Sequence, residues 1–152
     1  VVVELGAGTG AVTTVAERFL HPDSLFIAIE NDPTFARVCA ERVQRTVVLC
    51  DDAARIGDIL AEHLVDRVDV VLSGLPVPSL PRSVNVPVFE WLQTQPQAMF
   101  SQLTVMPWVY KRFYGGLFHE VDFELVPWNV PPGGVYHCRW ARDEATVRLP
   151  AR

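Results

Sequence analysis

A run of glycines near the start of the chain is the feature with the clearest chemical capacity. Gly6, Gly8 and Gly10 alternate with Ala7 and Thr9, directly after an apolar, β-branched segment. Glycine permits a tight turn and lets a ligand approach the backbone closely. The amino end of the helix that should follow offers unpaired N–H groups and a partial positive charge. The run therefore predicts a ligand-binding loop between a strand and a helix.

Two carboxylates indicate which kind of ligand this loop binds. Glu4 precedes the loop, and Glu30 lies about 20 residues beyond Gly10, where open α/β folds place the carboxylate that holds a ribose. The spacing G-x-G-x-G differs from the G-x-G-x-x-G that cradles a pyrophosphate, and Glu4 would repel a phosphate. A cationic nucleoside is therefore favoured over a dinucleotide. A glycine turn with no ligand is the less favoured alternative, because strand, loop, helix and Glu30 occur in order.

The elements that must position this loop alternate along the first two thirds of the chain. Strands are predicted at residues 1–5, 25–30, 46–49, 68–72 and 98–104. Helices, recognised by apolar residues at helical spacing, are predicted at residues 12–20, 33–43, 56–64 and 88–95. The proline-containing stretch Val77–Asn85 is predicted to be a loop. Such alternation is typical of a parallel sheet with crossover helices.

The last third of the chain predicts a different arrangement. Residues 118–126 and Val135–Trp140 flank the turn signal Pro131–Gly134, which indicates an antiparallel hairpin. The tail Arg142–Arg152 is predicted to be loosely held. We thus expect an α/β fold, a doubly wound, mostly parallel sheet with a C-terminal antiparallel hairpin, in one domain over residues 1–152. Because a central first strand needs helices on both faces, we also expect that an upstream helix is missing.

Composition narrows the possible partners. The 152 residues are 49% hydrophobic and 20% charged, as in a folded chain with a core. The net charge of −5 counts against binding to a nucleic-acid backbone. Neither the three cysteines nor the four histidines have metal-ligand spacing, so no metal site is expected. The cysteine thiols are expected to be reduced.

The motif residues resemble those of class I S-adenosylmethionine (SAM)-dependent methyltransferases. The run from Glu4 to Gly10 is similar to the first motif of that family, and Glu30 is similar to the second. Asp51–Ala53 resembles the segment that lies on the adenine ring, with Asp52 accepting from the adenine amino group and the Ala53 N–H meeting the ring. The resemblance implies SAM as cofactor. The implied SAM-binding residues are Glu4, Gly6, Ala7, Gly8, Gly10, Glu30, Asn31, Asp52, Ala53 and Ser73.

A narrower resemblance is to the bacterial phospholipid N-methyltransferases. The residues that carry it are Ser73-Gly74-Leu75-Pro76, Gln102, Thr104, Asn129-Val130-Pro131-Pro132 and Val135-Tyr136. It implies a cytoplasmic enzyme, peripheral on the inner face of the membrane, that methylates phosphatidylethanolamine towards phosphatidylcholine. It also implies a catalytic segment that orients the amine of a phospholipid or small amine substrate. That segment is Ser73, Gly74, Leu75 and Pro76.

Two other functions stay open. The related rRNA adenine dimethyltransferases place Asn, an aliphatic residue, Pro and an aromatic residue after the fourth strand, where this chain has Ser73 and Val77 as first and last residues. Val77 offers no π face for a flipped base, which favours a lipid amine over adenine. A SAM-binding domain without catalysis is the third possibility.

Aromatic residues supply two further hypotheses. The segment Trp108–Tyr114 joins aromatic side chains to Lys111 and Arg112, as favoured at an anionic membrane surface. A helix packed on the sheet with two solvated charges is an equal alternative. Tyr110, Tyr114 and Tyr136 could surround a methylated ammonium, although packing roles are favoured.

Overall fold

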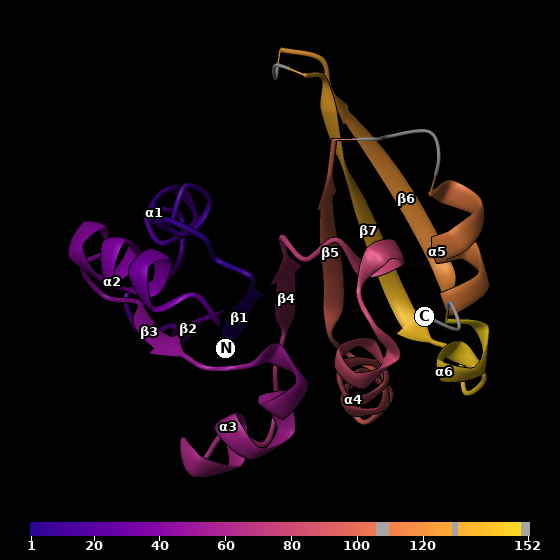
Figure 1. Cartoon of the computed structure of the whole chain (residues 1–152), viewed down its shortest axis with the longest axis horizontal. Helices are drawn as coiled ribbons and strands as arrows, with labels where there is room; N and C mark the ends of the chain where they lie inside the picture. The colour runs from indigo at the N-terminus through magenta and orange to yellow at the C-terminus, as the bar shows by residue number, and fades with distance from the viewer. Residues whose placement is uncertain (106–109, 129–130, 150–152) are drawn as a thin grey trace.

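The computed structural model describes residues 1–105, 110–128 and 131–149, which contain one seven-stranded mixed sheet (Figure 1). Its strands are β1 (Val2–Leu5), β2 (Phe26–Glu30), β3 (Val47–Cys50), β4 (Val70–Ser73), β5 (Met99–Thr104), β6 (Phe118–Val126) and β7 (Gly133–Ala141). They are ordered β3-β2-β1-β4-β5-β7-β6, and β7 runs antiparallel to both of its neighbours. The predicted doubly wound α/β class with a C-terminal antiparallel hairpin is confirmed.

The strand order reverses at β1, and this reversal decides where a ligand can bind. The chain runs outward from β1 through β2 to β3, and then returns to the other side of β1 for β4 and β5. Leu5 pairs with Ile29 and Ser73, and Ser73 pairs with Gln102. The carboxyl ends of these strands are therefore close together at one edge, where open α/β sheets bind their ligands.

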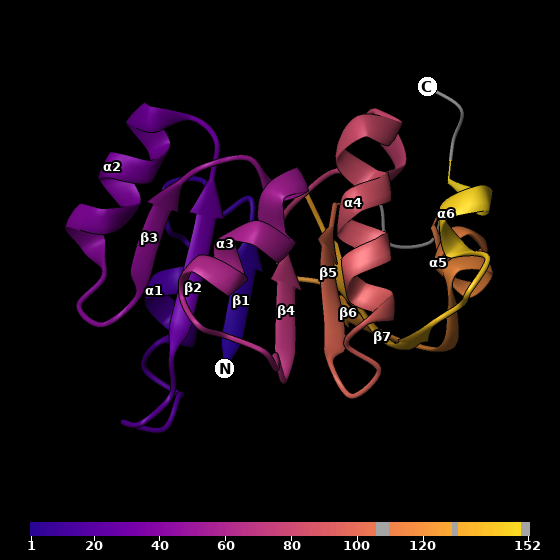
Figure 2. The ribbon, with the colours of Figure 1, turned by 90° about the horizontal axis from the view of Figure 1, so that it is seen from below.

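Helices cover both faces of the parallel part of the sheet. Figures 1 and 2 show α1 and α2 on one face and α3 and α4 on the other. The helices are α1 (Thr13–Ala16), α2 (Pro33–Arg42), α3 (Ile56–Glu62), α4 (Arg82–Gln93), α5 (Lys111–Leu117) and α6 (Ala145–Arg148), with the short 3₁₀ helices η1 (Ala53–Arg55) and η2 (Val77–Ser79). No helix within the described ranges is long and apolar enough to cross a membrane.

Alternate residues of the central strands supply two separate cores. Ile27 and Ile29 face a large cluster that also contains Ile59 of α3 and Phe89 of α4, whereas Ala28 faces a small one with Cys39 of α2. Burial on both faces explains why β1 and β2 are apolar throughout instead of alternating. The large cluster continues to the hairpin, where the rings of Phe89, Phe100 and Phe118 have centroids 5.3–6.1 Å apart.

Two predictions of secondary structure were wrong, one for a helix and one for a loop. The first helix ends at Ala16, and Val15 and Phe19 of its predicted apolar stripe are 51% and 84% exposed. The predicted loop over Val77–Asn85 instead contains η2 and the first turn of α4. Pro87 lies inside α4, and its presence concealed the start of that helix in the sequence.

The C-terminal tail is packed up to Leu149, so the prediction of a loose tail was wrong for that part. Ala145 and Leu149 are buried in the main core. The Arg82 guanidinium donates hydrogen bonds to the backbone oxygens of Leu149 at 2.9 Å and Thr146 at 3.0 Å. Residues 150–152 lie outside the described ranges.

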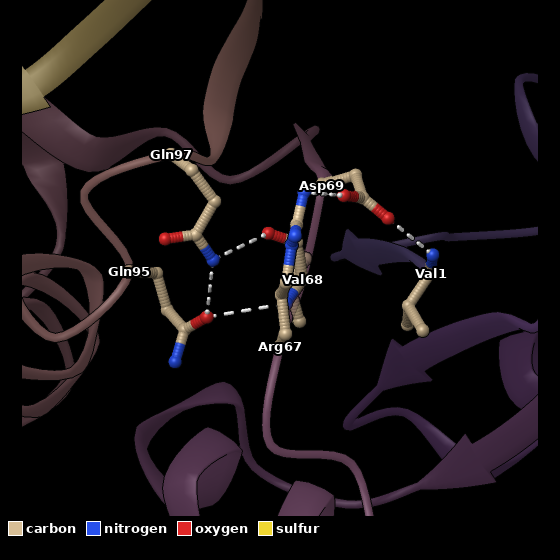
Figure 3. A network of polar contacts seen from close by, with 6 residues as sticks. All are labelled: Val1, Arg67, Val68, Asp69, Gln95 and Gln97. Carbon is tan, nitrogen blue, oxygen red and sulfur yellow. Dashed lines mark hydrogen bonds and ion pairs between the residues drawn. The ribbon is translucent and has the colours of Figure 1, made fainter.

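Polar contacts tie the sheet together at the edge opposite the glycine loop (Figure 3). The Val68 N–H donates to the side-chain oxygen of Gln95 at 3.1 Å, and the Gln97 side chain donates to the Val68 oxygen at 3.4 Å. The Asp69 N–H donates to the backbone oxygen of Val1 at 3.0 Å. These bonds join the amino ends of β1, β4 and β5, whose carboxyl ends carry the site.

Candidate functional site

The glycine loop connects β1 to α1, and its three glycines adopt left-handed backbone conformations. Their φ angles are +71° at Gly6, +56° at Gly8 and +81° at Gly10, which other residues rarely adopt. A Cβ on Gly6 would lie 2.7 Å from Leu75 Cδ2, and one on Gly10 would lie 2.9 Å from Cys39 Sγ. A Cβ on Gly8 would have no heavy atom within 4 Å apart from those of Gly8 and its two chain neighbours. Packing therefore requires glycine at the ends of the loop, whereas Gly8 borders open space that a ligand can enter.

Glu30 ties the loop to the end of β2. Its carboxylate is largely buried and accepts hydrogen bonds from the Gly8 N–H at 2.7 Å and the Asp32 N–H at 3.0 Å. A carboxylate has about four lone-pair positions, so positions remain for the hydroxyl groups of a ribose. The ribose-binding role of Glu30, and a cofactor contact by the neighbouring Asn31, stay predictions.

Glu4 is a buried carboxylate at the base of the loop. It is 3% exposed and accepts a hydrogen bond from the Thr13 hydroxyl at 2.6 Å. Burial raises the pKa of Glu4 from 4.5 to about 7, and the Thr13 bond partly opposes this rise. Because the folded chain keeps this proton more tightly than the unfolded chain, the associated stability is present below pH 4.5 and lost as the pH rises through 7. A cation beside Glu4 would offset the cost of ionising it.

The predicted adenine segment lies next to Glu30. The Asp51 N–H donates to the Glu30 backbone oxygen at 3.2 Å, and the Asp51 carboxylate pairs with Arg55 at 2.6 Å. Asp52 caps η1 by accepting from the Ala54 N–H at 2.9 Å, and Ala53 is buried. The structure thus brings Asp52 and Ala53 to the same edge as the glycine loop, while their contacts with adenine stay predictions.

A cavity of about 550 Å³ opens beside the loop, over the ends of β4 and β5. It is lined by Gly74, Leu75, Pro76, Pro78, Ser79, Gln102, Leu103, Thr104, Val105, Tyr110, Tyr114, Val126, Gly133, Gly134 and Val135. A Cβ on Gly74 would lie 2.7 Å from the Gly6 oxygen, so only glycine fits at that contact. The glycine loop and the cavity therefore share a wall, and a ligand on the loop would adjoin a ligand in the cavity.

Gln102 is a site residue whose role the sequence did not reveal. It is 2% exposed, and its side-chain NH₂ donates to the backbone oxygens of Ser73 at 3.1 Å, Leu75 at 2.8 Å and Leu103 at 2.8 Å. Three carbonyl partners fix the amide orientation, because a flipped amide would set oxygen against oxygen. Within the described residues its Oε1 atom is buried without a hydrogen-bond partner. A polar residue inside an otherwise buried strand was the signal that could have found it.

Hydrogen bonds hold the predicted catalytic segment, Ser73–Pro76, in place. Gln102 engages the carbonyls of Ser73 and Leu75, and the Pro76 oxygen accepts from the Ser79 N–H at 2.7 Å. Ser73 is fully buried, and its hydroxyl has no partner among the described atoms. Three of the four carbonyls expected to orient an amine are thus engaged within the protein. Gln102 itself lines the cavity, and its side-chain oxygen is a buried acceptor without a partner among the described atoms.

The same segment also receives support from α4. The Asn85 side chain donates to the backbone oxygens of Val77 at 2.8 Å and Leu80 at 3.1 Å. Val77, which stands where adenine-modifying enzymes have an aromatic residue, is 2% exposed and packs in the core. It therefore presents no surface on which a base could stack.

Two of the three predicted cage tyrosines line the cavity. Tyr110 and Tyr114 contribute to its wall, whereas Tyr136 packs behind them with its ring centroid 4.9 Å from that of Tyr114. Burial raises the pKa of Tyr114 far above its usual value, so its phenol stays neutral. Lys111 and Arg112 are exposed on the first turn of α5. Trp108, Val109, Asn129 and Val130 lie outside the described residues, so predictions for them rest on the sequence.

Comparison with known proteins identifies the family, although no family model matches the chain. An ornithine lipid N-methyltransferase from Singulisphaera acidiphila is 43% identical over 148 residues, which span 94% of this chain and 77% of that enzyme. The chain belongs to the family of this enzyme, within the class I SAM-dependent methyltransferases.

Solved structures agree with this fold. An O-methyltransferase from Bacillus cereus in complex with SAH has a TM-score of 0.71 at 14% identity, covering 91% of this methyltransferase and 73% of that chain. Human methyltransferase-like protein 13 in complex with SAH has a TM-score of 0.65 at 17% identity, covering 97% and 79%. The methyltransferase fold is thus shared at low identity.

Alanine substitutions at Gly8 and Gly10 should affect the methyltransferase differently. Gly10→Ala should lower the free energy of unfolding by about 1–3 kcal/mol, because the new methyl group meets Cys39 at a positive φ. Gly8→Ala should cost only about 1 kcal/mol in stability, yet weaken SAM binding about tenfold or more, because its methyl group enters the open space. Urea unfolding and calorimetry measure the two effects. Unaltered SAM affinity in Gly8→Ala would show that the cofactor does not approach there.

SAM binding near pH 7 should release a fraction of a proton. A cation beside Glu4 favours its charged form and lowers its pKa from about 7. Calorimetric heats near pH 7 should then differ between buffers of different ionisation enthalpy, such as Tris and phosphate, and a buffer pair of this kind should give equal heats at about pH 9, where Glu4 is already ionised. Glu4→Gln keeps an acceptor for Thr13 without ionising, so its heat should not depend on the buffer. Equal heats for the unaltered chain in both buffers would exclude a positive charge beside Glu4.

Proposed function

We propose that this methyltransferase transfers a methyl group from SAM to the amine nitrogen of a membrane-lipid head group. The observation that carries the proposal is the wall shared by the glycine loop and the apolar cavity, where Gly6 and Gly74 touch. The relative at 43% identity is a lipid N-methyltransferase, which supports a lipid amine as the acceptor class.

The residues of the cofactor side fit SAM. Gly8 leaves room for a ligand against the backbone, and the high pKa of Glu4 suits a site completed by a cation. When bound, SAM supplies an electrophilic methyl group on a sulfonium. Glu4 would face the positive charge of the cofactor, and Glu30 would hold its ribose.

The cavity favours the reactive form of the amine. Only a neutral amine has a lone pair for attack, and among the described residues that line this space none has a charged side chain. An ammonium that entered it would lose hydration without gaining an ion pair, which lowers its pKa and releases its proton to water. Gln102 Oε1 would then accept one N–H of the amine and aim the lone pair across the shared wall. Positioning and desolvation supply the catalysis in this scheme, without a dedicated general base.

Phosphatidylethanolamine, converted towards phosphatidylcholine, is the head group that we propose as acceptor, and ornithine lipid is the alternative within the same class. Both present a primary amine. The exposed Lys111 and Arg112 follow the cavity residue Tyr110, which supports peripheral contact with an anionic membrane on its cytoplasmic face.

An assay with SAM carrying a radiolabelled methyl group tests the acceptor. The enzyme should label phosphatidylethanolamine or ornithine lipid in vesicles, and leave rRNA unlabelled because Val77 offers no stacking surface and the net charge is −5. Extraction into organic solvent separates labelled lipid from labelled RNA. Label in rRNA would reverse the proposal. SAM binding by calorimetry without transfer to any amine would instead indicate a non-catalytic binding domain.

Gln102→Met should separate amine binding from loop support. This near-isosteric change removes the acceptor, so kcat/KM for the lipid amine should fall roughly 10- to 100-fold while the Kd for SAM stays nearly constant. Asn85→Leu is the matched control, because Asn85 also holds the segment after β4 yet is not among the cavity-lining residues. If both variants lose activity equally at equal loss of stability, Gln102 acts only through the backbone.

A further inference from the structure

The described part of the chain exposes large apolar side chains at the turn end of the β6–β7 hairpin. Leu125 is 43% exposed, Val126 39% and Trp128 94%, and Val105, which follows β5, is 60% exposed. We call these four residues the hairpin tip. Figure 1 shows this end of the hairpin extending beyond the helices, at the top of the view. A cluster of this kind is unusual at a water-exposed surface and marks a contact site.

The hairpin tip also forms one side of the cavity mouth. Val105 and Val126 line the cavity, as do Gly133 and Gly134, which pair with Val126 and Leu125. The apolar surface is therefore continuous from the exposed tip into the space where we place the acceptor amine. Whatever covers the tip also lies against the entrance to the cavity.

The occupant follows from the proposed function, on which this inference rests. Each CH₂ group of an acyl chain costs about 0.8 kcal/mol to expose to water, so a two-chain lipid stays in its bilayer while its head group reacts. The mouth of the cavity must consequently come to the depth of the head groups. The rim of that mouth is then the surface that meets the bilayer.

The chemistry of the rim matches a bilayer interface. Tryptophan is enriched at the head-group level because its ring is apolar and its N–H is polar. Lys111 and Arg112 stand exposed just after the cavity-lining Tyr110, where they suit anionic head groups. Glu124 is the first carboxylate behind the tip on β6, and it faces His137 at 3.7 Å. The apolar surface of the hairpin tip is thus bordered by the polar side chains of Glu124 and His137.

We infer that the hairpin tip inserts into the head-group region of a lipid bilayer and thereby brings the cavity mouth to the lipid amine. The remaining described surface has no comparable apolar group beside the cavity mouth. Trp140, 51% exposed near the other end of β7, lies about 23 Å from Gly133 along a strand that rises about 3.3 Å per residue. It provides a control of the same residue type on the same hairpin.

The test is sedimentation with vesicles of phosphatidylcholine and phosphatidylglycerol. Trp128→Glu should lower the partition coefficient of the full chain about tenfold or more, whereas Trp140→Glu should leave it nearly unchanged. Quenching of tryptophan fluorescence by brominated lipid gives a second readout with milder variants, because Trp128→Phe should reduce it clearly more than Trp140→Phe does. Thermal unfolding establishes that the variants are folded.

Several outcomes would overturn the inference. Unchanged binding of Trp128→Glu, equal losses in both glutamate variants, or no vesicle binding by the unaltered chain would each do so. A larger species in size-exclusion chromatography that Trp128→Glu dissolves would assign the tip to self-association instead. Methyl transfer to a water-soluble short-chain lipid amine is measured separately. If Trp128→Glu retains that activity but binds no vesicles, both the proposed function and the docking site are supported. If it retains the activity and binds vesicles normally, only the docking site is overturned.

Discussion

The contact between the ends of β1 and β4 is the constraint on which the site depends. The Gly74 N–H donates to the Leu5 oxygen at 2.9 Å, and a side chain at Gly74 would collide with the Gly6 oxygen. Two strands that are far apart in the sequence thus leave the sheet in backbone contact and then diverge. The glycine loop turns to one side and the segment Gly74–Pro76 to the other. The glycine loop and the cavity adjoin because nothing larger than hydrogen separates the two backbones there.

Buried amides hold the acceptor side of this arrangement. Gln102 and Asn85 reach the segment after β4 from a strand and from a helix, and each donates to two or more of its carbonyls. Such bonds fix a loop without charge, and the described residues that line the cavity include no charged side chain. A buried carboxylate is found only on the cofactor side among the residues discussed, as Glu4 and Glu30. The two halves of the site therefore differ in charge as their ligands require.

The sequence predicted the parallel half of this molecule well, because local signals and tertiary needs coincide there. Continuous apolar strands, the Asp32-Pro33 helix start and three glycines with positive φ each have one physical cause that is readable locally. The exposed Phe19 and the packed tail up to Leu149 were predicted wrongly. The tail is held by the Arg82 side chain, a partner that is distant in the sequence. Spacing along the chain carries no information about such partners.

The role of Gln102 was hidden for the same reason, since it arises from the register between β4 and β5. Ser73 ends its strand opposite Gln102, whereas β5 continues to Thr104 and pairs there with Gly134 of β7. β7 pairs in turn with β6, so that Val126 lies opposite Gly133. At this edge the strands therefore extend progressively further from β4 through β5 to the β6–β7 hairpin. Within the described ranges no strand fills the space left by this difference in length, and the cavity lies there.

This stepped edge explains why the antiparallel hairpin belongs to the site and is not merely an appended pair of strands. β6 and β7 are nine residues long, against four in β1 and β4. The glycine loop follows short parallel strands, and the longer antiparallel strands extend beyond it at the same edge of the sheet. The part of the β6–β7 hairpin that extends past the rest of the sheet has one face towards the cavity and one towards the surroundings. Val126 lines the cavity and is also 39% exposed, which suits the proposed acceptor, a lipid whose head group alone enters the cavity.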